Sequence, residues 1–189
     1  MLAQTRALPR DLSGQPVLPT WSLRPGTLWA LELIAAAGFR LDCGLCPAGT
    51  PGCGTPGVTR GPMAVRLFSG RQLREFPPSV LPPLGLGLSG GFFLRNPPLG
   101  STVAALRDAE ARGVPLVLYV HPWEVDPEPP RVRLPALWAV ARYGGLPRMA
   151  DRMEQLLGRY RFAPLGTLAD HVDWTRVPTW VCPEAGGAP

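Results

Sequence analysis

Residues 101–121 read STVAALRDAEARGVPLVLYVH, and this stretch decides the fold class of the chain. Its first part predicts a helix from Ser101 to Arg112, which Gly113 ends in a left-handed cap. Leu116–Val120 then follows as an unbroken run of strand formers. Because a strand without polar alternation is typical of a parallel sheet covered by helices on both faces, we expect a buried parallel strand here. The inward face of the helix is expected to carry Val103, Leu106 and Ala109.

The same order of elements occurs earlier, in residues 25–42, which read PGTLWALELIAAAGFRLD. Pro25 suits the first turn of a helix, and Gly38 suits its left-handed end. Residues 39–42 then predict a short strand. A helix, a glycine stop and a strand, found twice, indicate an α/β fold. Further expected elements are strands near residues 65–68 and 73–76 and a helix over residues 147–160, with Met149, Met153, Leu156, Leu157 and Tyr160 on one face.

The length and composition suit a folded protein with long loops. The chain has 189 residues, enough for one domain or one and a half, and its apolar fraction of 46% is ample for a core. The 22 Gly and 25 Pro together form a quarter of the chain. Because they cluster, we expect structured segments separated by irregular loops.

The charge pattern and the apolar segments limit the class of partner. All 19 basic residues are Arg, and the net charge of +5 suits an anionic partner. The arginines are spread singly, with no RNA-binding signature or zinc-finger spacing, so nucleic acid is not an expected partner. No segment approaches the ~18 apolar residues that cross a bilayer, and residues 1–19 lack the apolar core of a signal peptide. We therefore expect a cytoplasmic chain without a membrane span.

The cysteines do not predict a metal site. Cys43, Cys46 and Cys53 lie close together, but Cys182 is far away in the sequence and no His lies nearby. A structural zinc needs four ligands, usually supplied as two close pairs. We therefore expect thiols in a loop and no metal bound by this chain.

His121 is the main candidate for chemistry because it follows the predicted strand directly. In parallel α/β folds the carboxyl end of a strand faces the ligand site, and histidine is the most frequent general acid or base there. The alternative is a histidine that only hydrogen-bonds its own loop. Trp123 is expected to offer a sugar-stacking face or to fill the core, whereas Glu124 and Asp126 lie among prolines and suit turn capping.

Residues 118–127 read LYVHPWEVDP, which resembles the V/L-Y-x-H-P-W-E-x-D-P signature of polysaccharide deacetylases. The signature belongs to the exopolysaccharide-locus (exosortase-associated) subgroup of the NodB-homology family. The resemblance covers roughly residues 15–168, and His121–Pro127 is its most specific part. Other stretches that resemble the subgroup, in the right order, are Leu18–Leu23 with Thr27–Leu31, Gly38–Asp42, Glu75–Pro77, Gly90–Phe93 and Arg159–Phe162.

The resemblance implies a fold and a division of the chain. The fold would be the C-terminal part of an incomplete (β/α) barrel of the polysaccharide deacetylase type, with a helical C-terminal extension. Residues 15–130 would form the C-terminal half of the barrel, residues 131–170 the helical extension and residues 171–189 a tail.

The resemblance also implies a chemistry, the metal-dependent N-deacetylation of amino sugars. In that family a metal held by an Asp and two His polarises the acetamide, and an Asp activates water. A late His protonates the departing amine, and His121 matches it by position. Trp21, Asp42 and Trp123 are the expected substrate-binding residues, and an N-acetylated polysaccharide is the expected partner.

The first half of the family pattern is missing from this chain. The family's ligands come as an Asp-Asp dipeptide and a His-x3-His helix start, whereas this chain has no Asp-Asp and only two His, His121 and His171. Val17 stands where the family has the Arg that orients the base. No metal is therefore expected in this chain, although a divalent metal such as zinc serves the complete family domain.

Two functions remain open at this point. The first is a polysaccharide deacetylase-like hydrolase that is inactive alone, either because a separate polypeptide supplies the N-terminal half of the barrel or because the gene product is truncated. The second is a non-catalytic carbohydrate-binding or scaffold remnant of that family, which would use Trp123 and the loops.

Overall fold

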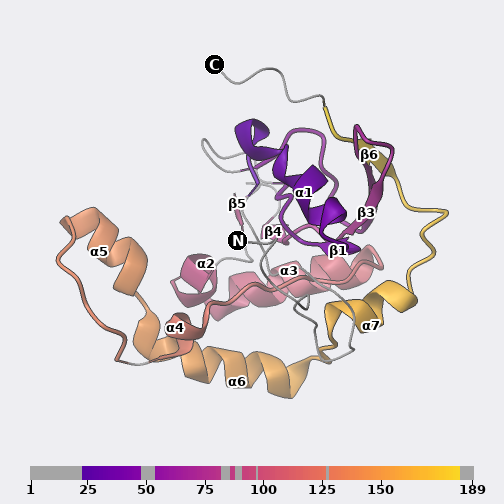
Figure 1. Cartoon of the computed structure of the whole chain (residues 1–189). Coiled ribbons are helices and arrows are strands. Elements are labelled where there is room, and N and C mark those ends of the chain that lie inside the picture. The colour runs from indigo at the N-terminus through magenta and orange to yellow at the C-terminus, as the bar shows by residue number, and fades with distance from the viewer. Residues whose placement is uncertain are drawn as a thin grey trace.

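The computed structural model describes residues 23–47, 54–81, 86–87, 91–96, 98–126 and 128–183. Figure 1 shows a small sheet with α1 (Ala30–Ala36) in one part of the molecule and helices such as α3 (Leu99–Ala111) and α6 (Met149–Arg159) in another. The segment that leaves α3 passes between these parts, and its side chains contact apolar clusters of both.

The main sheet has the strand order β1-β3-β2-β6. β1 (Leu41–Asp42) runs parallel to β3 (Gln72–Glu75), which is antiparallel to β2 (Met63–Arg66). β2 in turn runs parallel to β6 (Thr179–Val181). These described strands form a mixed sheet that is not closed into a barrel. The α/β class predicted from the sequence is confirmed at this level.

One face of the sheet packs against α1. Leu31 and Ile34 of this helix join the same apolar cluster as the inward side chains of the strands. Gly38 follows the helix with a φ of 92°, a left-handed conformation that ends the helix as predicted. The buried apolar side chains of β2 and β3 are Met63, Val65 and Leu73.

The remaining elements are short, and most of them are helical. They are the 3-10 turns η2 (Pro25–Thr27) and η3 (Leu146–Arg148), the helices α2 (Gly91–Arg95), α4 (Pro122–Val125), α5 (Ala136–Tyr143) and α7 (Leu165–Asp170), and the antiparallel pair β4 (Val80–Leu81) and β5 (Leu86–Gly87).

α3 occurs where the sequence predicts a helix, although it begins two residues before Ser101. Leu106 and Ala109 are buried as predicted, whereas Val103 is only half-buried. Gly113 adopts a φ of 64° beyond the end of the helix, which confirms the predicted stop.

The prediction of a buried sheet strand at Leu116–Val120 is wrong. The segment is extended but half-buried, and its described backbone partner is Ser79. The Ser79 amide donates to the Val117 carbonyl at 3.3 Å, and the Val117 amide donates to Ser79 Oγ at 2.9 Å. Pro77 and Pro78 precede Ser79 and have no N–H to donate, so a regular ladder cannot continue along this segment.

The helix predicted over residues 147–160 is confirmed as α6, but its apolar face is narrower than expected. Met149 and Leu156 are buried, whereas Leu157 is exposed. The segment after His121 also differs from expectation, because it forms the helical turn α4 rather than an extended loop. Pro122 at the first position of that turn favours helix over extended chain.

β6 lies in the segment that was expected to be a tail. Its residues pair in register with β2, so the chain returns to the sheet after α7. Within the described residues, no helix is long and apolar enough to cross a membrane.

Candidate functional site

α4 fixes the position of His121 at the end of the extended segment. His121 precedes the helix with extended backbone, and its amide donates to Glu124 Oε2 at 2.9 Å. The Glu124 amide donates in return to the His121 carbonyl at 2.9 Å. This reciprocal bonding satisfies amides at the start of the helix and leaves the imidazole exposed.

Tyr119 is the direct partner of the His121 ring. Its hydroxyl oxygen lies 2.7 Å from Nε2 and 3.1 Å from Nδ1, and the two ring centroids are 4.6 Å apart. Burial, followed by the charges of Glu124 and Cys43, raises the pKa of Tyr119. The phenol therefore keeps its proton at neutral pH and remains able to donate to the imidazole.

A buried ion pair supports α4 from below. Arg95 Nη2 of α2 lies 3.5 Å from Glu124 Oε1, and the two residues are only 1% and 2% exposed. Burial lowers the pKa of Arg95, and the charge of Glu124 opposes this shift. The Glu124 carboxylate also lies directly against Gly91, where any added Cβ would overlap with it.

The same arginine binds the end of α5. Arg95 Nη1 donates to the Arg142 carbonyl at 2.8 Å, and Nη2 donates to the Ala141 carbonyl at 3.2 Å. Its Nε donates to the Gly91 carbonyl at 3.1 Å within α2. One buried side chain therefore joins α2, α4 and α5.

Trp123 is held between His121 and two arginines. Its ring lies 6.1 Å from that of His121, at an interplanar angle of 25°. The guanidinium carbons of Arg95 and Arg142 lie 5.2 Å and 4.7 Å from the Trp123 ring. These contacts engage the ring of Trp123 within the protein. They do not test the predicted sugar-stacking role of Trp123, which stays a prediction.

A cleft of about 480 Å³ opens beside these residues. Aromatic side chains dominate its walls, and Trp138 of α5 is the most open of them at 66% exposure. Phe92 of α2 and Trp138 of α5 were not candidates in the sequence, because no motif or spacing distinguishes them from other apolar residues of short helices. The residues that line the cleft include Phe92, Tyr119, His121, Trp123, Val132, Leu134, Trp138 and Arg142.

The structure does not bring Asp42 to this cleft. Asp42 ends β1 and is paired in register with Glu75 of β3, and both side chains are 0% exposed. The Gly44 amide donates to Asp42 Oδ2 at 3.2 Å, and the Leu45 amide donates to Glu75 Oε1 at 3.0 Å. Burial, and then the charge of Asp42, raise the pKa of Glu75 well above its usual range. Burial also raises the pKa of Asp42, so both carboxyls favour their protonated forms more than exposed carboxyls do.

The other predicted positions lie elsewhere. Trp21 and Cys53 are outside the described residues. Cys43, Cys46 and Cys182 are thiols. In the part of the chain that the structure describes, no three His, Cys, Asp or Glu side chains come together as a metal would require.

Fold and site together define an open α/β protein with an aromatic and cationic cleft at the end of an extended segment. The chain matches the family model described as Domain of unknown function (DUF3473) over residues 43–170, more than half of its length. It therefore belongs to this family. His121, Trp123 and Arg95 fall within the matched range, whereas Trp21 and Asp42 fall outside it.

No further relative accompanies this match. No curated protein matches the chain, and no solved structure does either. No deacetylase family is matched, so the deacetylase resemblance is carried by the quoted motifs alone.

Proposed function

We propose that the chain is a polysaccharide deacetylase-like protein whose cleft binds an N-acetylated amino-sugar polymer. The observation that carries the proposal is the exposed imidazole of His121 on the wall of a cleft lined by Phe92, Tyr119 and Trp138. Sugar rings bind proteins by laying their C–H faces on aromatic rings while their polar groups meet a few convergent side chains. The cleft offers both kinds of contact.

His121 would act on the leaving amine. When the amide C–N bond breaks, the nitrogen takes a proton, and an imidazolium at the cleft wall can supply it. Tyr119 would orient the ring through its hydroxyl at 2.7 Å from Nε2. The buried Arg95–Glu124 pair would hold the helical turn that positions both groups.

The chain's own donor set does not fit the family's metal. Only two histidines are present, and His171 is engaged at the end of α7, where Nδ1 lies 2.8 Å from the Thr167 carbonyl. No step through a metal is therefore derived for this chain. A separate barrel half, supplied by another polypeptide, would activate the water.

The finer fold is part of the same proposal. An incomplete (β/α) barrel would place β1 beside a strand of that other half, because β1 forms an edge of the described sheet. Parallel pairing of β1 with β3 and of β2 with β6 supports this arrangement. A parallel edge can accept a further strand of the same direction.

A second function, carbohydrate binding without catalysis, is favoured by one observation. Both ring nitrogens of His121 lie within 3.1 Å of the Tyr119 hydroxyl, a contact typical of a structural histidine. Replacing His121 with Ala in a reconstituted enzyme discriminates between the two functions. If the protein is a hydrolase, the reconstituted enzyme turns over substrate and the substitution lowers that turnover. If the protein only binds carbohydrate, the mixture shows no turnover with or without the substitution.

The test of binding is calorimetric titration of the full chain with an N-acetylated chitooligosaccharide. We expect Trp138→Ala to weaken binding by about three- to tenfold, the usual worth of one aromatic contact. Leu157→Ala is the matched control, because Leu157 is also exposed, at 55%, but lies on α6 and does not line the cleft. Equal binding by all three proteins, or no binding by any, would contradict the proposed ligand.

A further inference from the structure

Large exposed apolar side chains gather in and just before α5. Leu137 is 79% exposed and Trp138 is 66% exposed, and α5 has no buried residue. A helix that is apolar around most of its circumference needs a cover, because water solvates such a surface poorly. We call this surface the α5 patch, and its members are Val132, Leu134, Leu137, Trp138 and Val140.

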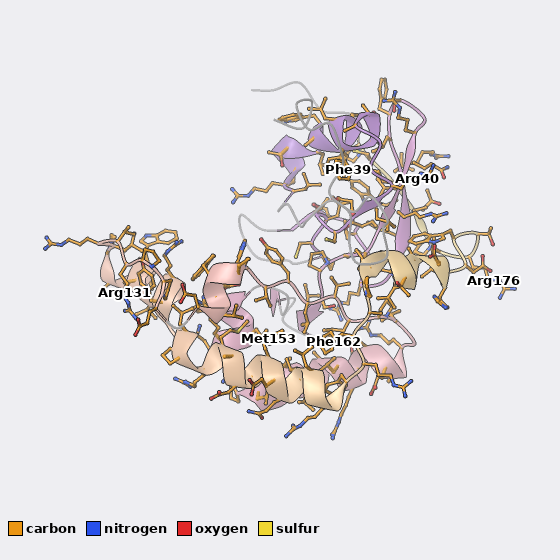
Figure 2. The ribbon with its side chains drawn as sticks, turned by 60° about the horizontal axis from the view of Figure 1, so that its bottom comes forward. Phe39, Arg40, Arg131, Met153, Phe162 and Arg176 are labelled. Carbon is orange, nitrogen blue, oxygen red and sulfur yellow. The ribbon has the colours of Figure 1, made fainter. Side chains whose placement is uncertain are left out.

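The α5 patch is a preformed unit. The Val132 amide donates to Tyr143 Oη at 2.9 Å, and the Arg131 guanidinium carbon lies 5.2 Å from the Tyr143 ring, so the preceding loop folds back onto the helix. Arg95 anchors the carboxyl end of α5 through two carbonyls. Figure 2 shows Arg131 beside α5 at the outer end of the molecule. The apolar side chains are therefore presented outward on a fixed support.

The segment that forms the α5 patch carries charges of one sign, and the exposed acids Glu128 and Asp151 flank it in the sequence. Arg131, Arg133, Arg142 and Arg148 lie in residues 129–150, and this stretch contains no Asp or Glu. Arg131, Arg133 and Arg142 are exposed. A surface that combines exposed Trp, Leu and Val with arginines and lacks acids complements an anionic lipid surface, where the apolar side chains enter the acyl boundary and the cations meet headgroups.

We propose that the α5 patch docks the protein onto an anionic membrane surface. The helix lies in the plane of the interface, with Leu137 and Val140 below the headgroups and the arginines at headgroup level. Trp138 then sits at the boundary between lipid and the cleft, since it also lines that cleft. Val132, Leu134 and Trp138 of the patch also line the cleft, whereas Leu137 and Val140 do not, so Leu137 is the position that separates membrane docking from sugar binding.

The experiment is co-sedimentation of the full chain with vesicles of phosphatidylcholine, with and without phosphatidylglycerol, at low and high salt. We expect binding to the anionic vesicles that weakens with salt, as surface electrostatics require. Leu137→Glu should weaken binding at least about tenfold, because an apolar anchor is lost and an anion is added. Arg133→Gln should weaken it about fivefold.

Phe68→Ser is the matched control, because Phe68 is 74% exposed but lies on the turn between β2 and β3. It should bind as the unchanged protein does, and circular dichroism should show all variants folded. Equal binding by Leu137→Glu would overturn the proposal. So would binding to heparin without binding to vesicles, which would indicate a polyanion, or a dimer in light scattering that Leu137→Glu dissociates, which would indicate a second copy.

Discussion

Arg95 shows how one buried side chain can determine the geometry of the site that it helps to line. Replacing it with Met keeps most of the side-chain volume and leaves Glu124 buried without its ionic partner. We expect the free energy of unfolding to fall by about 3–5 kcal/mol, measured by urea denaturation. Arg112→Met is the control, because its pair with Asp108 is exposed and should contribute at most about 0.5 kcal/mol. Similar small losses for both variants would contradict the role assigned to Arg95.

Asp42 and Glu75 form the second decisive contact at this scale. Because burial and the charge of Asp42 raise the pKa of Glu75 above its ordinary value of 4.5, the folded protein binds more protons than the unfolded chain. Stability is therefore fully present below about pH 4.5 and is lost as the pH rises towards the raised pKa. Glu75→Gln removes this titration and should flatten the pH dependence of the free energy of unfolding in that range. Parallel pH profiles for the two proteins would refute this account.

Among the elements, the turn between α5 and η3 depends on a glycine that packs against the site. Gly145 has a φ of 73°, and a Cβ there would lie 2.7 Å from the Arg95 carbonyl. We expect Gly145→Ala to lower the free energy of unfolding by at least about 1–2 kcal/mol. Gly158→Ala in α6 should instead raise it, by up to about 1 kcal/mol, because a Cβ there meets nothing within 4 Å. Thermal denaturation of both variants checks the opposite signs.

Local signals predicted the elements far better than the contacts between them. Apolar periodicity and glycine stops located α1, α3 and α6, and the strands expected near residues 65–68 and 73–76 overlap β2 and β3. The prediction for Leu116–Val120 was wrong because an apolar run indicates contacts on two faces, which the half-buried segment does make, but does not indicate a strand that pairs with it. The segment that bonds to it through Ser79 contains Pro77 and Pro78, which have no N–H for a ladder. The sequence does not reveal that these two segments lie side by side.

The candidate site likewise contains some residues that the sequence predicts and others that it does not. His121 and Trp123 could be located because they sit in one short motif directly after an apolar run. Arg95 could not, since its bond to Glu124 joins helices that are separated in the chain and meet only through packing. Glu75 was similarly hidden, because its register with Asp42 depends on how β1 and β3 align.

At the scale of the whole molecule, the residues that the structure describes pack into three apolar clusters rather than into one closed core. One lies between α1 and the sheet, one beneath α6, and a small third cluster joins Leu41 and Phe76 of the sheet part to Ala169 of α7. Val117 packs on the third cluster and Leu116 on the second, so the extended segment connects them. Because His121 follows this segment, its position depends on both parts of the molecule.

Whether the chain is catalytically active by itself depends on the whole molecule. We expect the chain alone to release no acetate from an acetylated chitooligosaccharide, with or without divalent metal. Water that no metal activates keeps a pKa far above neutral pH, whereas a catalytic zinc lowers the pKa of its bound water to about 7. A general acid such as His121 typically contributes about 10²–10⁴-fold, far less than amide hydrolysis at neutral pH demands.

A front half that carries Asp-Asp and His-x3-His, supplied as a second polypeptide, should restore turnover if the two halves form one barrel. In that mixture His121→Ala should reduce acetate release by about 10²–10⁴-fold while the mixture binds metal as tightly as before, because the imidazole donates a proton and holds no metal. Leu157→Ala, exposed on α6, serves as the unaffected control. Metal-dependent acetate release by the chain alone would place the catalytic centre elsewhere in this sequence. An active mixture indifferent to His121→Ala would leave His121 a structural partner of Tyr119.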